Sequence, residues 1–112
     1  MEMNLEELPG GATLVVLRGR LDVAGASSIE LKFSATAGAR KAVVVDLLGV
    51  SFIASMGMRL LLLVAKTMAA RGGKMALLSP VPEVASVLHT AGIDTVIPIC
   101  NERDTAVAAV AA

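Results

Sequence analysis

The sequence predicts an α/β fold: an N-terminal antiparallel hairpin joined to a mostly parallel sheet of about five strands, with four helices. Three observations predict it. The apolar, β-branched run at 43–45 is typical of a strand buried on both faces of a sheet. Apolar residues recur at helical spacing in the segments on either side of this run. After the hairpin, strands and helices alternate along the chain, which implies right-handed crossovers.

Composition limits the class of protein. The 112 residues predict one domain, 1–112, large enough for a core of its own. A net charge of zero and the absence of Trp and Tyr argue against nucleic-acid binding. Cys100 is the only cysteine, which excludes an intrachain disulfide and a Cys-rich zinc site. The most apolar run, 60–65, is far shorter than the ~20 residues that a membrane span needs. We therefore expect a cytoplasmic protein without membrane insertion.

The first half of the chain predicts the hairpin, a helix and the central strand. Apolar and polar residues alternate over 1–6, a turn follows at 9–11, and a second strand runs over 12–17 until Gly19 and Arg20 end it. A helix over about 24–37 carries its apolar stripe at Ala26, Ile29, Phe33 and Ala37. Asp46 ends the central strand, and residues 47–53 are expected to form a loop around Gly49.

The second half predicts three helices and two strands. One helix runs from near Met56 to Ala70, and its expected buried face holds Leu60, Leu63, Val64 and Thr67. A strand at 75–78 leads to a helix that begins at a proline. Pro98 cannot donate to a strand ladder, so the strand expected at 95–99 belongs at a sheet edge. Asn101 is the expected cap of a last helix that runs to about Val110.

Ser55 stands between the central strand and the second helix, at the edge of an α/β sheet where function usually lies. A serine there can cap the free N–H groups of the first helical turn. The same position also suits a phosphate acceptor, because a helix N-terminus favours negative charge. Both roles stay open on position alone.

Met56 and Met58 flank Gly57 at this helix start. We expect Met56 to fill a gap in the core, while Met58 is left open between the core and a protein-binding surface.

Four other residues suggest chemistry less strongly. Asp22 and Asp46 both end predicted strands, where two carboxylates can bind Mg²⁺ or act in acid–base catalysis; the stronger expectation is that each accepts backbone N–H groups in a turn. His89 and Cys100 formally allow a nucleophilic pair, although structural roles fit them better. The chain has no GxGxxG, no GxxxxGK[ST] and no GxSxG, so catalysis and a cofactor have little support.

Four segments together resemble the STAS domain, and in particular its stand-alone anti-sigma-factor antagonists. They are RGRLD at 18–22, VVVDLLGVSFIASMG at 43–57, RGGKMALLSP at 71–80 and VLHTAGIDTVIPI at 87–99. The resemblance covers nearly the whole chain in order, and the Phe-Ile-x-Ser-x-Gly segment is its most specific part.

The resemblance implies a partner-switching role. Unphosphorylated antagonists of this kind bind a serine/threonine kinase anti-sigma factor, which frees the sigma factor. The kinase then phosphorylates a residue at the start of the second helix and breaks the complex, and a PP2C-type phosphatase restores it. By this match Ser55 is the phosphate acceptor, Gly57 lets the backbone approach the partner, and Asp22 lies in the loop beside it. The partner surface then comprises Asp22, Ser55, Met56, Gly57, Met58 and Arg59.

The chain departs from the family pattern at two positions. Family members commonly carry Asp-Ser-Ser-Gly or Asp-Ser-Thr-Gly, whereas this chain has Ala54-Ser55-Met56-Gly57. The departures motivate an alternative function, a non-phosphorylated accessory subunit of a transport ATPase complex. A third possibility is a small enzyme or nucleotide-binding protein that uses Asp22 and Asp46. The expected oligomeric state is a monomer or a weak dimer.

Overall fold

Five strands form one mixed sheet, and their order in space repeats their order in the chain. The computed structural model describes residues 1–111; the expected domain also includes Ala112, which lies outside the described residues. The elements in order are β1 Glu2–Glu7, β2 Thr13–Leu21, α1 Val23–Gly38, β3 Ala42–Ile53, α2 Ser55–Ala70, β4 Lys74–Leu78, α3 Pro82–Thr90, a 3₁₀ turn Ile93–Thr95, β5 Ile99–Cys100 and α4 Arg103–Val110.

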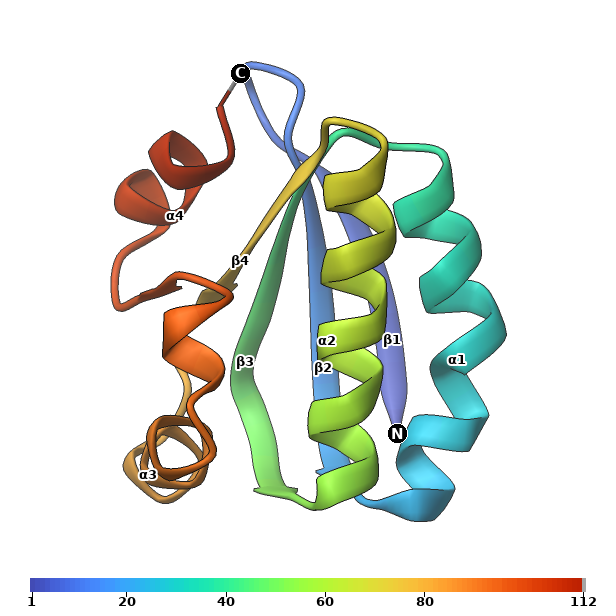
Figure 1. Cartoon of the computed structure of the whole chain (residues 1–112), viewed down its shortest axis with the longest axis vertical. Helices are drawn as coiled ribbons and strands as arrows, with labels where there is room; N and C mark the ends of the chain where they lie inside the picture. The colour runs from blue at the N-terminus through green and yellow to red at the C-terminus, as the bar shows by residue number, and fades with distance from the viewer. Residues whose placement is uncertain (112) are drawn as a thin grey trace.

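Among the strands of residues 1–111, only the first pair is antiparallel. β1 and β2 form the predicted hairpin, with Met3 opposite Leu17, and the pairs from β2 to β5 are all parallel. α1 and α2 run side by side over one face of the sheet, while α4 lies over the other face (Figure 1). The predicted fold class is therefore confirmed.

A layer of buried side chains lies on each face of the sheet. The larger layer joins α1, α2 and α3 to the sheet and includes Phe33, Leu61 and Leu88, none of which is exposed to solvent. The smaller layer holds α4 against the sheet through Ala106 and Val110. The four predicted apolar positions of α1 are all buried, so its expected stripe is confirmed.

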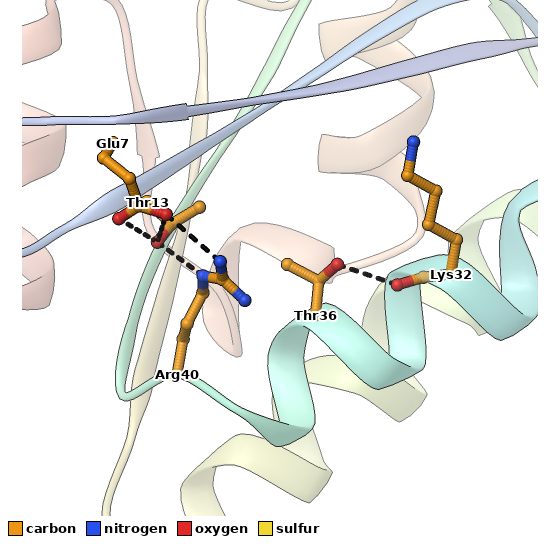
Figure 2. A network of polar contacts seen from close by, with 5 residues as sticks. All are labelled: Glu7, Thr13, Lys32, Thr36 and Arg40. Carbon is orange, nitrogen blue, oxygen red and sulfur yellow. Dashed lines mark hydrogen bonds and ion pairs between the residues drawn. The ribbon is translucent and has the colours of Figure 1, made fainter.

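A polar cluster ties the hairpin to the segment that follows α1 (Figure 2). The Arg40 Nε donates to the Thr13 hydroxyl at 2.9 Å, and a terminal nitrogen of Arg40 donates to the Glu7 carboxylate at 3.1 Å. The Thr13 hydroxyl in turn donates to Glu7, so this buried hydroxyl both accepts and donates a hydrogen bond. Thr36 donates instead to the backbone carbonyl of Lys32, within α1 (Figure 2).

The predicted loop at 47–53 is wrong. β3 continues to Ile53, because its second half pairs with β2 from Arg18 to Leu21, with one register shift before Arg18 and a second between Gly19 and Arg20. β2 is longer than expected for the same reason, and Gly19 and Arg20 lie within it. β4 pairs with β3 only as far as Asp46, so the second half of β3 has a strand neighbour on one side alone.

Three smaller expectations are also wrong. On α2, Leu63 and Thr67 are exposed, and Leu61 and Met68 are buried in their place. The last strand is only Ile99–Cys100, since residues 93–95 form a 3₁₀ turn and Pro98 precedes the ladder; its edge position is confirmed. Glu102, not Asn101, occupies the cap position of α4, without a side-chain hydrogen bond.

Candidate functional site

The N-termini of α1 and α2 lie together at the carboxyl ends of β2 and β3 (Figure 1). Leu21 pairs with Ile53 at the last position of this ladder, and the N–H of Ala54 donates to the Leu21 carbonyl at 3.0 Å. Each helix then begins within two residues of its strand. Since both helices point their N-termini to one edge, two sets of free backbone N–H groups and two favourable dipole ends meet there.

Ser55 is the first residue of α2 and is exposed. The cap position belongs to Ala54, whose side chain accepts no hydrogen bond, so the expected capping role of Ser55 is wrong by one residue. Ser55 has helical backbone, whereas a cap residue has the extended backbone that brings its side chain to the first-turn N–H groups. Among the described residues, no hydrogen bond involves the Ser55 side chain, so its oxygen is available to a reagent from solution.

Gly57 is buried, and it lies against the same chain. A β-carbon at this position would come within 2.5 Å of the Leu21 carbonyl oxygen. The glycine thus lets α2 approach β2, whereas the sequence had suggested an approach to a partner. Gly25 plays the same part in α1, where a β-carbon would collide with the carbonyl of Arg20. Sequence reasoning missed Gly25, although a glycine three residues after Asp22 near a helix start was a usable signal.

Asp22 caps α1. Its Oδ1 accepts from the backbone N–H of Gly25 at 2.8 Å, which confirms the expected turn role, and its Oδ2 pairs with the Arg20 Nε at 3.4 Å. The pKa of Asp22 is lowered, mainly by the hydrogen bond from the Gly25 N–H; desolvation opposes this effect, and the hydrogen bond and charge of Arg20 add to the lowering. A charged carboxylate therefore lies beside the start of α2 at neutral pH.

Arg20 also stacks on Phe52. Its guanidinium carbon lies 4.3 Å from the centre of the ring, and the two residues are directly paired across β2 and β3. Sequence reasoning missed this pair because the segment that holds Phe52 was expected to be a loop. The stack places a cation and an aromatic ring next to Asp22, at the rim of the same edge.

Met56, Met58 and Arg59 complete the expected partner surface. Met56 is 38% exposed, so the prediction that it packs in the core is wrong; Met58 is half-buried and packs against the core. Arg59 is exposed and lines, with Met56, a shallow hollow of about 90 Å³ between α1 and α2. The exposed members of the predicted set, Ser55, Met56 and Arg59, thus lie at the N-terminal end of α2.

The other candidates do not join this site. Asp46 pairs with Val16, well back along β2, and its Oδ1 accepts the N–H of Leu48 at 3.0 Å. His89 pairs with Asp94 at 2.7 Å on the surface, and Cys100 is buried in the layer below α4. Within residues 1–111, no three side chains of the kinds that bind metals are grouped as a metal site. The positions of these residues therefore do not support the two-carboxylate site or the Cys–His pair.

Comparison with known proteins settles the family. The family model described as the STAS domain matches residues 3–106. The chain belongs to the STAS domain family. A relative from Bordetella bronchiseptica, BtrV, is named as a proposed anti-sigma factor antagonist; it is 32% identical over 97% of this chain and 94% of its own length.

Solved structures of other proteins share the fold. An anti-sigma factor antagonist from Mycobacterium paratuberculosis superposes with a TM-score of 0.86 at 24% identity, over 97% of this chain and 92% of that one. The Bacillus cell fate determinant SpoIIAA in its phosphorylated form superposes with a TM-score of 0.70, also at 24% identity, over 93% and 96% of the two chains. Among the helices of residues 1–111, none is long enough and apolar enough to span a lipid bilayer.

Proposed function

We propose that this STAS protein is a regulatory binding protein of the anti-sigma-factor antagonist type, not an enzyme. In the unmodified state it binds a serine/threonine kinase anti-sigma factor. Phosphorylation of Ser55 by that kinase releases it, and a PP2C-type phosphatase restores binding. The observation that carries the proposal is the exposed, unbonded hydroxyl of Ser55 at the first residue of α2.

The position of Ser55 supports a switch that leaves the fold intact. A phosphate there meets the positive end of the α2 dipole, and no core side chain has to move because Ser55 is already exposed. The modification adds about −1.5 to −2 charges beside Asp22, whose carboxylate is already ionised. The two negative groups together repel an acidic partner surface.

The neighbours of Ser55 supply the proposed contact surface. Asp22, Met56 and Arg59 are at least partly exposed around the hydroxyl, and the half-buried Met58 adds adaptable apolar area. Gly57 contributes indirectly, since its close approach to Leu21 fixes the position of the helix start. The similarity to BtrV over nearly the full length of both chains adds support for an antagonist role.

A second candidate is an unswitched STAS subunit of a transport ATPase complex. Two observations favour it: Ala54 replaces the carboxylate that commonly precedes the acceptor serine, and the exposed Met56 makes the helix start more apolar. Such a subunit would stay bound to its ATPase and carry no phosphate.

The deciding experiment is the intact mass of the protein purified from its own cells, followed by peptide mapping. We expect one phosphate on Ser55 in a fraction of the molecules, and none in a Ser55→Ala variant. A Ser55→Asp variant should lose the kinase partner in a pull-down that the wild-type protein passes. A protein that carries no phosphate under any growth condition and co-purifies with an ATPase would establish the second candidate instead.

A further inference from the structure

A groove runs along the surface between α1 and α2, starting at the Ser55 end. Two hollows of about 90 Å³ and 110 Å³ lie along it and share Leu63 in their lining. The α1 side of both hollows is lined by small or short residues, namely Ala26, Ser27, Ser34 and Ala37, with Glu30 between them. Leu63 is 52% exposed, so the middle of the groove offers apolar surface that the chain itself does not cover.

Four of the exposed residues of α2 form one stripe beside this groove. Met56, Arg59, Leu63 and Lys66 follow at spacings of three and four, which places them on one face of the helix. α2 contains no carboxylate, so Arg59 and Lys66 leave its surface positive. On α1, Glu30 lines the same hollow as Arg59, whereas the Lys32 Nζ donates to the Met3 carbonyl on β1, so the groove region carries two cations and one carboxylate. Within the described residues, neither Arg59 nor Lys66 is in an ion pair. Apolar and positive residues therefore alternate along the stripe.

We infer that this groove is the docking site of an acidic amphipathic helix of the kinase partner. Small side chains on α1 allow a third helix to approach closely, and the exposed Met56 and Leu63 offer contacts to its apolar face. Its carboxylates would lie against Arg59 and Lys66, which outnumber the single carboxylate of Glu30 on the groove wall. The inference rests on the proposed function, because the groove begins at Ser55 and its occupant is assigned to the partner that Ser55 controls.

The charge of the groove explains how one phosphate releases such a helix. A phosphoserine at position 55 carries about −1.5 to −2 charges, close in size to the positive charge that Arg59 and Lys66 supply. Arg59 lies four residues after Ser55, which puts the two side chains on the same helix face. The phosphate therefore competes with the partner's carboxylates for Arg59, and it repels them as well.

Site-specific photo-crosslinking in the organism's own cells tests the location and the occupant. The chain is expressed with Leu63→p-benzoylphenylalanine, and in a control strain with Leu48→p-benzoylphenylalanine, which is 64% exposed on β3. We expect an adduct at position 63 only, and mass spectrometry should map its partner side to an acidic segment with apolar residues at helical spacing. No adduct at position 63, a crosslink to a second copy of this chain, or a neutral or basic segment would each overturn the inference.

A binding titration with the mapped segment as a synthetic peptide tests the charge argument. At low salt we expect the double variant Arg59→Gln/Lys66→Gln to raise Kd about tenfold, since each exposed ion pair contributes modestly. The control Lys41→Gln/Lys74→Gln removes two exposed lysines that do not lie on α2, and it should bind like the wild type. Equal Kd values for both double variants would overturn the inference.

The outcomes also separate this inference from the proposed function. If Leu63 crosslinks to an acidic helix but Ser55→Asp binds the peptide as tightly as the wild type, the groove stands and the Ser55 switch fails. If Ser55 carries phosphate but position 63 gives no adduct, the switch stands and the groove is excluded.

Discussion

Gly57 of α2 lies directly against Leu21 of β2. A β-carbon on Gly57 would come within 2.5 Å of the Leu21 carbonyl oxygen and 2.7 Å of the Leu21 Cγ. That carbonyl is held in turn by the N–H of Ala54 at 3.0 Å, so the strand end cannot easily yield. This one close approach sets the position of the first turn of α2, and with it the position of Ser55.

Gly57→Ala should therefore destabilise the fold. We expect the free energy of unfolding to fall by about 2–3 kcal/mol, because the added methyl group forces the helix start away from the sheet. The matched control is Gly38→Ala, also in a helix, where a β-carbon would meet no atom within 4 Å. Alanine there should not destabilise the protein, and its gain should stay below the value of about 0.5–1 kcal/mol for a helix interior, since Gly38 is the last residue of α1. Urea unfolding of both variants measures the contrast, and equal shifts would contradict the packing argument.

Ser55→Ala should leave stability within about 0.5 kcal/mol of the wild type. The hydroxyl is exposed and Ala54 holds the cap position, so no fold-stabilising bond is lost. A capping serine would instead cost about 1 kcal/mol on replacement by alanine. Thermal and urea unfolding distinguish the two values, and the larger one would return Ser55 to the capping role.

Asp22→Asn should make the free energy of unfolding depend less on pH in the acid range. The pKa of Asp22 lies below its ordinary value of 3.8 because the Gly25 N–H and Arg20 favour the charged form. The folded protein thus binds fewer protons than the unfolded chain, so this carboxylate stabilises the fold above pH 3.8, and its contribution is lost as the pH falls through the lower folded-state value. Asparagine keeps a capping oxygen but does not titrate. The urea unfolding midpoints of the wild type and of Asp22→Asn should converge as the pH falls. A difference between the two midpoints that stays constant across the acid range would refute the assignment.

Thr13→Val should cost about 1–2 kcal/mol. The substitution removes the acceptor of the Arg40 Nε and the donor to Glu7, at a position with no solvent access. Thr105→Val serves as the control, since Thr105 is exposed on α4. Chemical denaturation of the pair gives the difference, and a neutral Thr13→Val would show that water replaces the lost contacts.

Much of the fold could be predicted because the informative patterns are local. The hairpin turn, the valine run at 43–45 and the apolar stripe of α1 each depend on residues within one element. The second half of β3 could not be predicted in this way. Its partner is the distant Arg18–Leu21 segment, and Gly49 looks like a loop residue although it is needed where a β-carbon would approach the Arg18 Cγ to 2.9 Å.

Details of the candidate site could not be predicted from local sequence patterns either. Four consecutive leucines at 60–63 fit more than one helical face, so periodicity did not identify which of them are buried. Ser55 could be placed at the start of α2, but the one-residue difference between cap and first helical position depends on backbone angles. The stack of Arg20 on Phe52 needs the register of two strands, which no local pattern encodes.

Strand order that repeats chain order also bears on synthesis. As the chain leaves the ribosome, β1 and β2 can form a hairpin first, and each later strand then adds to an edge that is already present. No strand has to wait for a partner encoded far downstream. The nascent sheet has two open edges: that of β1, which no later strand covers, and that of the newest strand, which the next segment covers and so protects from pairing with another chain.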